Sequence, residues 1–231
     1  MKRVLLKLIK KISRVAIQSD LSNIKSELKR IATHQTALYV TEHMANISSV
    51  ESRNAVHDVG LSHIKPNGLV LEFGVFSART INYIARKLPN RTVHGFDSFE
   101  GLPEFWRDGF EKGMFAVKML PSVQTNVELH KGWFNETIPA FLKTTVSNQE
   151  IAYLHIDCDL YSSTKTIFEN LGDLIVPGTI IVFDEYFNYP GWLEGEFLAF
   201  KEFVKSSKLK YEYLTYTYNK EQVAVKILSD Y

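Results

Sequence analysis

Two apolar stretches in the middle of the chain, Ile151–Ile156 and Thr179–Phe183, are continuous and rich in β-branched residues. Such runs are typical of strands that are buried on both faces of a parallel sheet. Between them, apolar residues recur at helical spacing over residues 167–175, with Ser162 or Ser163 expected as the N-cap. A strand, a helix and a strand in this order form a right-handed crossover. We therefore expect the two strands to run parallel and to end at the same edge of one sheet.

The same patterns predict further elements on both sides of this unit. Short apolar runs predict strands at Leu69–Phe73, Thr92–Phe96 and Asn126–His130, and a hairpin of Tyr211–Tyr218 with Gln222–Leu228. Helical spacing predicts helices at Thr80–Leu88, near Thr137–Thr144 and at Leu193–Val204. This alternation predicts an α/β fold with a mostly parallel, seven-stranded sheet and a C-terminal antiparallel hairpin.

The first 65 residues are expected to form a helical extension that precedes an α/β domain at residues 66–231. Residues 1–36 are basic and amphipathic, and a second helical segment is expected over Leu38–His63. Lysines interrupt the apolar positions near the N-terminus, so we expect neither a membrane span nor a signal peptide. The basic helix either makes a weak contact with anionic lipid or a second subunit, or presents a solvated basic face. The sequence leaves these alternatives open.

Acidic residues follow both strands of the central unit. Asp157 and Asp159 come after the first strand, and Asp184 and Glu185 come after the second. Ligands of open α/β sheets bind at the carboxyl edge, where these side chains converge. Neighbouring carboxylates raise one another's pKa, and a hard cation such as Mg²⁺ would relieve the repulsion. The alternative is that the acids only cap strands and the next helix in solvent.

A second candidate site lies nearer the N-terminus of the domain. Gly74 stands between a predicted strand and a predicted helix, as in the first unit of nucleotide-binding sheets. A dinucleotide fingerprint needs three glycines here, so a pyrophosphate cradle is poorly supported. Asp97 ends the next strand at the position where a ribose diol is bound, or it is a plain loop or N-cap residue. The irregular stretch Ser98–Thr125 is either a lid over a ligand or a loop anchored to the core.

Composition narrows the classes of function. The chain has 231 residues, of which 45% are hydrophobic, enough to bury one substantial core. A formal net charge of +1 gives no general bias toward nucleic acid as a partner. Cys158 is the single cysteine, which excludes an internal disulfide and a cysteine-based zinc site. A reducing cytoplasm is the compartment that this cysteine content favours.

Five ordered motifs together resemble a known family. They read LEFGVFSARTI, HGFDSFEGLPEFW, VELHKGWFNETIP, LHIDCDLYSST and VFDEYFNYPGW. The series resembles class I S-adenosylmethionine-dependent methyltransferases, and within them the macrocin/mycinamicin sugar O-methyltransferase family, over residues 68–228. The resemblance implies a Rossmann-like sheet with helices on both faces, S-adenosylmethionine as donor, a Mg²⁺ ion and a hydroxyl acceptor on a sugar or other small molecule.

The resemblance also implies roles for individual residues. The residues expected around the donor, from its methionine through its ribose to its adenine, are Glu72, Gly74, Ser77, Asp97, Ser98, Gly132 and Trp133. The residues expected to hold the metal are Asp157, Asp184 and Glu185, with Asp157, Asp159 and His155 as catalytic candidates. His155 shares a strand face with Asp157, and it is either catalytic or a hydrogen-bonded structural histidine. Family members often associate through N-terminal helices, so a homo-oligomer is implied.

Two other classes of function remain open at this stage. A nicotinamide-dependent oxidoreductase would use the same kind of sheet, although the missing glycines argue against it. A protein that binds the donor without turnover would also keep the fold. The identity of the acceptor is not encoded in any recognisable motif.

Overall fold

The structure is a computed structural model that describes residues 23–144 and 149–229. The chain divides into two compact units. The first comprises the chain up to Ala45 together with Asn188–Gly191, and the second comprises Asn46–Phe187 and the chain from Trp192 onward. Most of the basic helix that we expect over residues 1–36 lies outside the described residues. Its contacts with lipid or a second subunit stay predictions.

The first unit is built on helix α2, Ile24–His43. Asn23 begins this helix, because its side chain accepts a hydrogen bond of 3.0 Å from the Lys25 backbone N–H. Thr33 Oγ1 donates to Asn188 Oδ1, and the Asn188 backbone N–H donates to Thr36 Oγ1, both at 2.9 Å. These bonds attach the distant segment 188–191 to the helix.

The chain between α2 and the first long strand differs in part from the second helical segment expected over Leu38–His63. A separate helix, α3, spans Arg53–Ser62, and strand β1, Ser49–Val50, precedes it. Strand β1 is too short for its apolar pattern to be recognised, and it pairs in parallel with strand β7, Lys210–Thr217. The unit that contains the sheet therefore begins at Asn46, whereas we expect the helical extension to reach residue 65.

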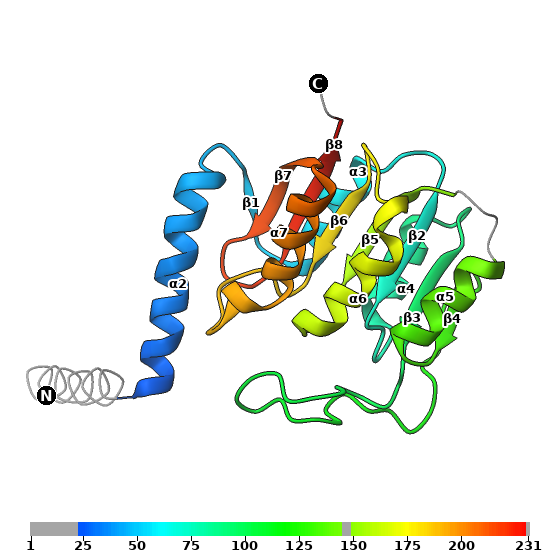
Figure 1. The fold of residues 1–231 in the computed structure, drawn as a ribbon, viewed down its shortest axis with the longest axis horizontal. Coiled ribbons are helices and arrows are strands. Elements are labelled where there is room, and N and C mark those ends of the chain that lie inside the picture. Colours follow the sequence, from blue (N-terminus) through cyan, green and yellow to red (C-terminus); the bar gives the residue numbers. More distant parts are fainter. Residues whose placement is uncertain (1–22, 145–148, 230–231) are drawn as a thin grey trace, which may run out of the picture. The chain divides into compact units, whose positions relative to one another are not determined.

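Eight strands form one sheet in the order β1-β7-β8-β6-β5-β2-β3-β4 (Figure 1). Strand β8 is antiparallel to its neighbours β6 and β7, and the other pairs are parallel. The predicted mostly parallel sheet and its closing hairpin are confirmed, and β1 is the eighth strand that the sequence does not predict. The remaining strands are β2 Leu69–Phe73, β3 Val93–Asp97, β4 Val127–Lys131, β5 Ile151–Ile156, β6 Ile180–Phe183, β7 Lys210–Thr217 and β8 Val223–Leu228.

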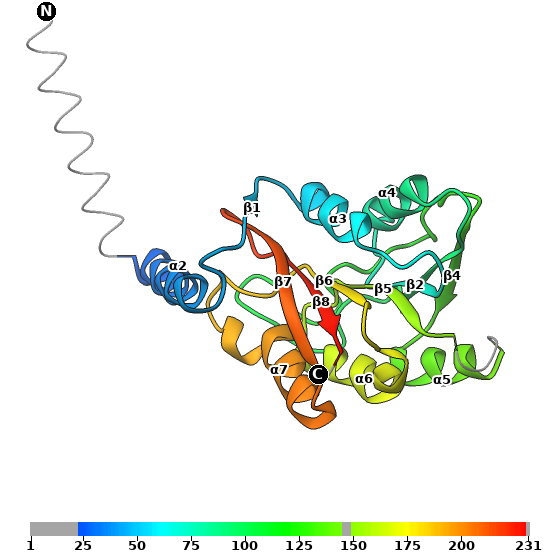
Figure 2. The ribbon, with the colours of Figure 1, turned by 90° about the horizontal axis from the view of Figure 1, so that it is seen from above.

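Helices cover both faces of this sheet (Figure 2). Helices α3 and α4 (Arg79–Lys87) lie on one face, and α5 (Phe134–Thr144), α6 (Tyr161–Leu171) and α7 (Glu196–Ser207) lie on the other. This is the layered, Rossmann-like arrangement that the family resemblance implies. Among the described residues, no helix combines the length and the hydropathy needed to span a bilayer.

The central strands are buried along their whole length, which explains their continuous apolar runs. Every residue of β2, β5 and β6 is buried. Two polar residues interrupt these runs, Glu72 on β2 and His155 on β5, and they are directly paired in the register of the sheet. The Glu72 Oε2 to His155 Nδ1 distance is 2.9 Å, so each satisfies part of the other's hydrogen-bonding capacity.

Strands β5 and β6, which are connected through α6, run parallel, as the sequence predicts. The expected N-cap is wrong, because α6 begins at Tyr161 and Leu160 stands at the cap without a side-chain bond. Asp159 adopts a left-handed backbone conformation, with φ of 66°, and turns the chain into the helix before the serines are reached. Ser162 instead donates a hydrogen bond of 2.6 Å to Glu104 of the long loop.

Candidate active site

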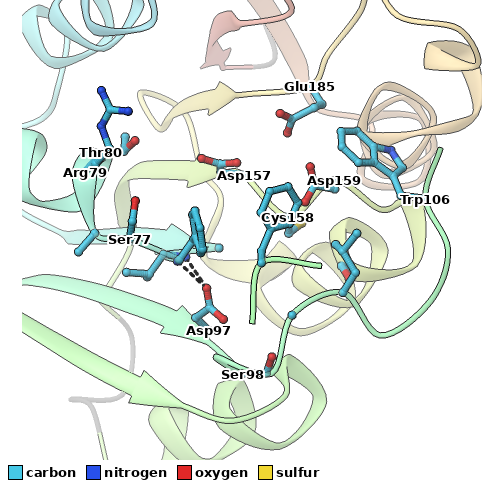
Figure 3. A pocket seen from close by; sticks show the side chains of 18 of the residues that line it. Ser77, Arg79, Thr80, Asp97, Ser98, Trp106, Asp157, Cys158, Asp159 and Glu185 are labelled. Atoms are coloured by element: carbon cyan, nitrogen blue, oxygen red, sulfur yellow. Dashed lines mark hydrogen bonds between the residues drawn. The ribbon is translucent and has the colours of Figure 1, made fainter. Parts of the chain in front are cut away.

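A cavity of about 1250 Å³ opens at the carboxyl ends of the parallel strands. Residues that follow β2, β3, β5 and β6 line it, together with the start of α3 and the loop after β3. In Figure 3, Asp157, Asp159 and Glu185 lie on one side of the cavity, and Asp97 and Ser98 lie on the other. The two candidate sites predicted from the sequence are therefore two walls of one cavity.

The Gly74 turn, residues 74–78, forms one wall. Gly74 has φ of +90°, and a Cβ at this position would overlap the carbonyl oxygen of Asp157. Phe76 and Ala78 also have positive φ, of 45° and 59°. Strained backbone of this kind costs roughly 1–3 kcal/mol per residue and is concentrated at ligand sites. Phe76 and Ala78 thus stand where further glycines would be expected, and both have a positive φ, which glycine adopts more readily.

Asp97 holds the Gly74 turn in this shape. Its Oδ2 accepts hydrogen bonds of 2.8 Å from the backbone N–H groups of both Val75 and Phe76 (dashed lines in Figure 3). Its Oδ1 accepts a bond of 2.6 Å from the Phe99 N–H. A carboxylate offers about four lone-pair positions, so these three bonds leave capacity for a ligand hydroxyl. The structure places Asp97 in the cavity wall and adds an organising role that the sequence does not reveal.

The residues expected around the donor are not all exposed to the cavity. Gly74, Ser77, Asp97, Ser98 and Trp133 line it. Gly132 does not, but its φ of +142° and its N–H bond of 3.0 Å to the Asp97 carbonyl oxygen position Trp133. Glu72 is fully buried and is not among the residues that line the cavity.

His155 is likewise fully buried and outside the cavity wall. Burial lowers its pKa to about 3, and burial also raises the pKa of Glu72 well above the usual range. Both shifts favour a pair without charge. Its Nδ1 makes the hydrogen bond to Glu72 expected of a structural histidine, whereas its Nε2 has no hydrogen-bond partner among the described residues.

The opposite wall carries a cluster of carboxyl groups, all buried except Asp157, whose side chain is 22% exposed. Four of its members follow β5 and β6, and the fifth, Glu196, begins α7: Asp157, Asp159, Asp184, Glu185 and Glu196. Burial first, and then the neighbouring carboxylates, raise the pKa of Asp157, Glu185 and Glu196 well above the usual range. The same causes, with Asp184 as the leading neighbour, raise the pKa of Asp159 to about 7. The cluster therefore resists full ionisation unless positive charge is supplied.

Glu196 is a residue that the sequence does not single out. Its side chain is fully buried, its Oε1 accepts a 3.3 Å bond from the Cys158 N–H, and its Oε2 accepts one of 3.3 Å from the Glu185 N–H. It thereby joins the two acidic strand ends to each other. No local pattern distinguishes it from Glu194 two residues earlier, because its role depends on distant backbone groups.

Arg53, at the start of α3, supplies positive charge to the cluster. Its guanidinium donates to Asp184, to Asp157 Oδ2 at 3.4 Å and to Thr80 Oγ1 at 3.3 Å. Burial acts to lower the pKa of Arg53, but Asp157 and Asp184 outweigh it and raise that pKa. The sequence gives no signal for this residue, because α3 precedes the predicted domain and reaches the site only through the fold.

The carboxyl cluster has the chemistry of a hard-cation site. Among the described residues, ligand atoms of His155, Asp157 and Asp184 lie within 4.8 Å of one another. The buried oxygens Asp184 Oδ1 and Glu185 Oε2 have no hydrogen-bond partner in the part of the chain that the structure describes. Carboxylate oxygens left unsatisfied in a buried cluster are the donor set that Mg²⁺ prefers. The residues present therefore fit such an ion, with Arg53 bound to two of the same carboxylates.

The loop over residues 98–125 contributes aromatic side chains to the cavity. Trp106, Phe110, Phe115 and the buried Leu102 line it, whereas Phe99 is buried in the hydrophobic core. Phe99 thus anchors the loop to the core, and the other four residues face the cavity. The geometry combines the two alternatives that the sequence leaves open.

Solved methyltransferases have a similar arrangement of sheet and helices. The calicheamicin methyltransferase CalS11 aligns with a TM-score of 0.58 and 24% identity, over 75% of this chain and 76% of that chain. The O-methyltransferase NovP aligns with a TM-score of 0.55 and 21% identity, over 76% and 80% of the respective chains. The fold is therefore that of class I methyltransferases.

Sequence comparison gives the family. Residues 71–186 match the profile of the family described as "Methyltransferase domain", which is half of the chain, and the chain belongs to this family. It is 31% identical to the 8-demethyl-8-(2,3-dimethoxy-α-L-rhamnosyl)-tetracenomycin-C 4'-O-methyltransferase of Streptomyces olivaceus, over 42% of each chain. It is 27% identical to the demethyldecarbamoylnovobiocin O-methyltransferase of Streptomyces niveus, over 46% of each chain. The matches thus span less than half the length of these relatives.

Proposed function

We propose that the protein is an S-adenosylmethionine-dependent O-methyltransferase whose acceptor is a hydroxyl of a sugar or glycosylated metabolite. The observation that carries this proposal is the convergence of the Gly74 turn and the carboxyl cluster on a single cavity. The names of the two Streptomyces relatives support it, because both act by O-methylation and one acts on a rhamnosyl group. The narrower assignment to the macrocin/mycinamicin sugar O-methyltransferase family belongs to the same proposal.

The donor would occupy the wall formed by the Gly74 turn. Asp97 and Ser98 would bind its ribose hydroxyls, Ser77 its methionine part and Trp133 its adenine, and all four residues line the cavity. Small-molecule sites usually measure about 300–1,000 Å³. The cavity of about 1250 Å³ therefore leaves room for an acceptor beside the donor.

Methyl transfer from a sulfonium is an in-line displacement, so alignment of the acceptor oxygen is the main task of the protein. The aromatic residues of the loop would exclude water from the acceptor, and Asp159 would accept its proton from the opposite wall. Asp157, Asp184 and Glu185 would hold Mg²⁺, which supplies charge stabilisation and a template for neighbouring acceptor oxygens.

The direct test is release of S-adenosylhomocysteine over a panel of sugar and catechol acceptors, with and without Mg²⁺. Turnover of a sugar acceptor is expected, and Asp159→Asn should abolish it while Asp173→Asn, at an exposed position, should not. Separate titrations with S-adenosylmethionine and NAD test the donor. Binding of NAD alone would favour an oxidoreductase, and donor binding without turnover of any acceptor would favour an inactive binding protein.

A homo-oligomer and a cytoplasmic location complete the proposal. The first rests on the family resemblance of the sequence and the second on its single cysteine. Light scattering of the full chain at several concentrations tests the first, and a fixed monomer would contradict it.

A further inference from the structure

A second group of metal-ligating side chains lies on strands β3 and β4, outside the cavity wall. It consists of His94, Glu128 and His130. His94 and Glu128 are directly paired in the register of the two parallel strands, and His130 follows two residues along β4 on the same face. The sheet itself thus brings the three side chains together.

Two of the distances between the three side chains match those around one small cation. His94 Nδ1 lies 3.2 Å from His130 Nε2 and 3.5 Å from Glu128 Oε2, and all three ligand atoms lie within 4.8 Å of one another. A tetrahedral ion bound at about 2.0–2.1 Å holds its ligand atoms roughly 3.3–3.4 Å apart. Little movement of the side chains is needed to admit such an ion.

Packing fixes the two imidazole rings from the apolar side. The His130 ring stacks on Phe96, with centroids 4.5 Å apart, and Phe141 contacts both histidines at 4.9 and 5.0 Å. The Glu128 side chain, in contrast, is 63% exposed, so the group is open to solvent on one side. Aromatic packing of this kind reduces the ordering that a bound ion would otherwise require.

The protonation of the group suits a metal site at neutral pH. Burial lowers the pKa of both His94 and His130. Neutral imidazoles are the form that binds metal, and a carboxylate beside them offsets part of the ion's charge. Two nitrogens and one oxygen favour Zn²⁺ or a similar transition metal over Mg²⁺, which prefers oxygen ligands.

We propose that His94 Nδ1, His130 Nε2 and a carboxylate oxygen of Glu128 bind one zinc-class cation, with water completing the coordination. The ion would link β3 to β4 near the carboxyl ends of both strands, where Asp97 and Trp133 line the cavity. There the Gly132 N–H bonds to the Asp97 carbonyl oxygen at 3.0 Å, so a metal at this place would stabilise the edge of the cavity. The proposal does not depend on the proposed function.

A direct histidine–histidine hydrogen bond also accounts for a distance of 3.2 Å, and experiment can distinguish the two. The full chain is stripped of metal with a chelator and titrated with Zn²⁺ by calorimetry and with Co²⁺ by visible absorption, in excess Mg²⁺ to occupy the carboxyl cluster. One saturable ion and the absorption bands of tetrahedral Co²⁺ are expected. Zn²⁺ should also raise the unfolding temperature.

Variants assign the ion to this group. Two separate variants, Glu128→Gln at an exposed position and His130→Gln, should each weaken Zn²⁺ binding by at least about tenfold. Loss of a residue that only hydrogen-bonds to a metal ligand already lowers metal affinity by about that factor, so loss of a ligand itself should cost no less. The control His63→Gln, on an exposed histidine outside the group, should bind as the unchanged protein does. Unaltered affinity in both test variants, or no saturable binding at all, would overturn the proposal.

Discussion

At the scale of single residues, the site depends on positions whose neighbours are far away in the chain. Gly74 can be predicted from its place between a strand and a helix, but its contact with the Asp157 carbonyl group cannot. Asp97 is recognisable as a strand-end acid, whereas its three backbone bonds are not. Arg53 gives no signal at all, because ion pairs between distant segments leave no pattern in the sequence.

Gly74→Ala should lower the free energy of unfolding by about 2–5 kcal/mol and abolish donor binding. The positive φ costs about 1–2 kcal/mol for a residue with a Cβ, and the overlap with Asp157 adds about 1–3 kcal/mol. Urea unfolding and calorimetric titration with S-adenosylmethionine measure the two effects.

Gly109→Ala is the matched control, because Gly109 has φ of +87° and no neighbour within 4 Å of a Cβ among the described residues. It should cost about 1–2 kcal/mol, the backbone contribution alone. Equal losses in the two variants would show that the contact with Asp157 does not matter.

His57 should make stability depend on pH below neutrality. Its side chain is buried on α3, it bonds to the Tyr153 hydroxyl at 2.7 Å, and burial lowers its pKa well below the usual range. Below about pH 6.5, His57 binds a proton in the unfolded chain, whereas it stays neutral in the folded protein because its pKa is lowered there. The stabilisation is therefore complete above that pH and is lost as the pH falls, by at most about 1.4 kcal/mol per pH unit.

Urea unfolding at pH 5, 6 and 7 measures this dependence. His57→Gln should reduce the slope of stability against pH, and the exposed control His63→Gln should leave it unchanged. An identical slope in the unchanged protein and in His57→Gln would assign the dependence to other groups.

At the scale of elements, burial decides what can be predicted. Strands β2 and β5 are predicted with their observed bounds, because burial on both faces gives an unbroken apolar run. The break between α2 and α3 and the short β1 are missed, since two residues carry no periodicity. The beginning of α6 is misplaced because a strained Asp159, rather than a serine cap, sets it.

Helix α3 is expected to depend on Arg53 for its attachment to the sheet edge. Arg53→Ala leaves buried carboxylates without their partner and should cost about 1–3 kcal/mol in the absence of Mg²⁺, less than for a fully buried pair because Arg53 is 39% exposed. The variant should also bind Mg²⁺ more tightly, because the guanidinium no longer competes for Asp157 and Asp184. Unfolding with and without Mg²⁺ measures both.

Arg86→Ala is the control for the Arg53 variant. Arg86 is exposed and lines the same cavity from α4, so its loss should change stability by no more than about 0.5 kcal/mol. If Mg²⁺ binds equally to the unchanged protein and to both variants, Arg53 and the metal do not share ligands.

At the scale of the whole molecule, the two walls of the cavity come from different parts of the sheet. Strands β2 and β3 lead into the wall that contains the Gly74 turn and Asp97, and β5 and β6 lead into the carboxyl cluster. The sequence predicts both walls from the acids and the glycine at strand ends. It cannot predict the cavity's size or its aromatic cover, because these depend on how an irregular loop folds back.

Asp184→Asn should lower turnover while leaving the affinity for the donor almost unchanged. Turnover should fall by at least about a hundredfold, because the metal and the charge balance at the acceptor are lost. The affinity for S-adenosylmethionine should stay within about threefold of the unchanged protein. Calorimetry and the S-adenosylhomocysteine assay measure the two quantities, and a parallel loss of donor binding would contradict the separation.

The position of β8 has a consequence for how the protein is made. Strands β6 and β7 are not paired with each other, because β8 lies between them although it follows both in the chain. A ribosome therefore releases strands β2 to β6 while one side of β6 still has unpaired backbone groups. An open strand edge of this kind attracts other nascent chains. Premature termination before residue 223 would thus leave a translation product that aggregates rather than a shorter folded protein.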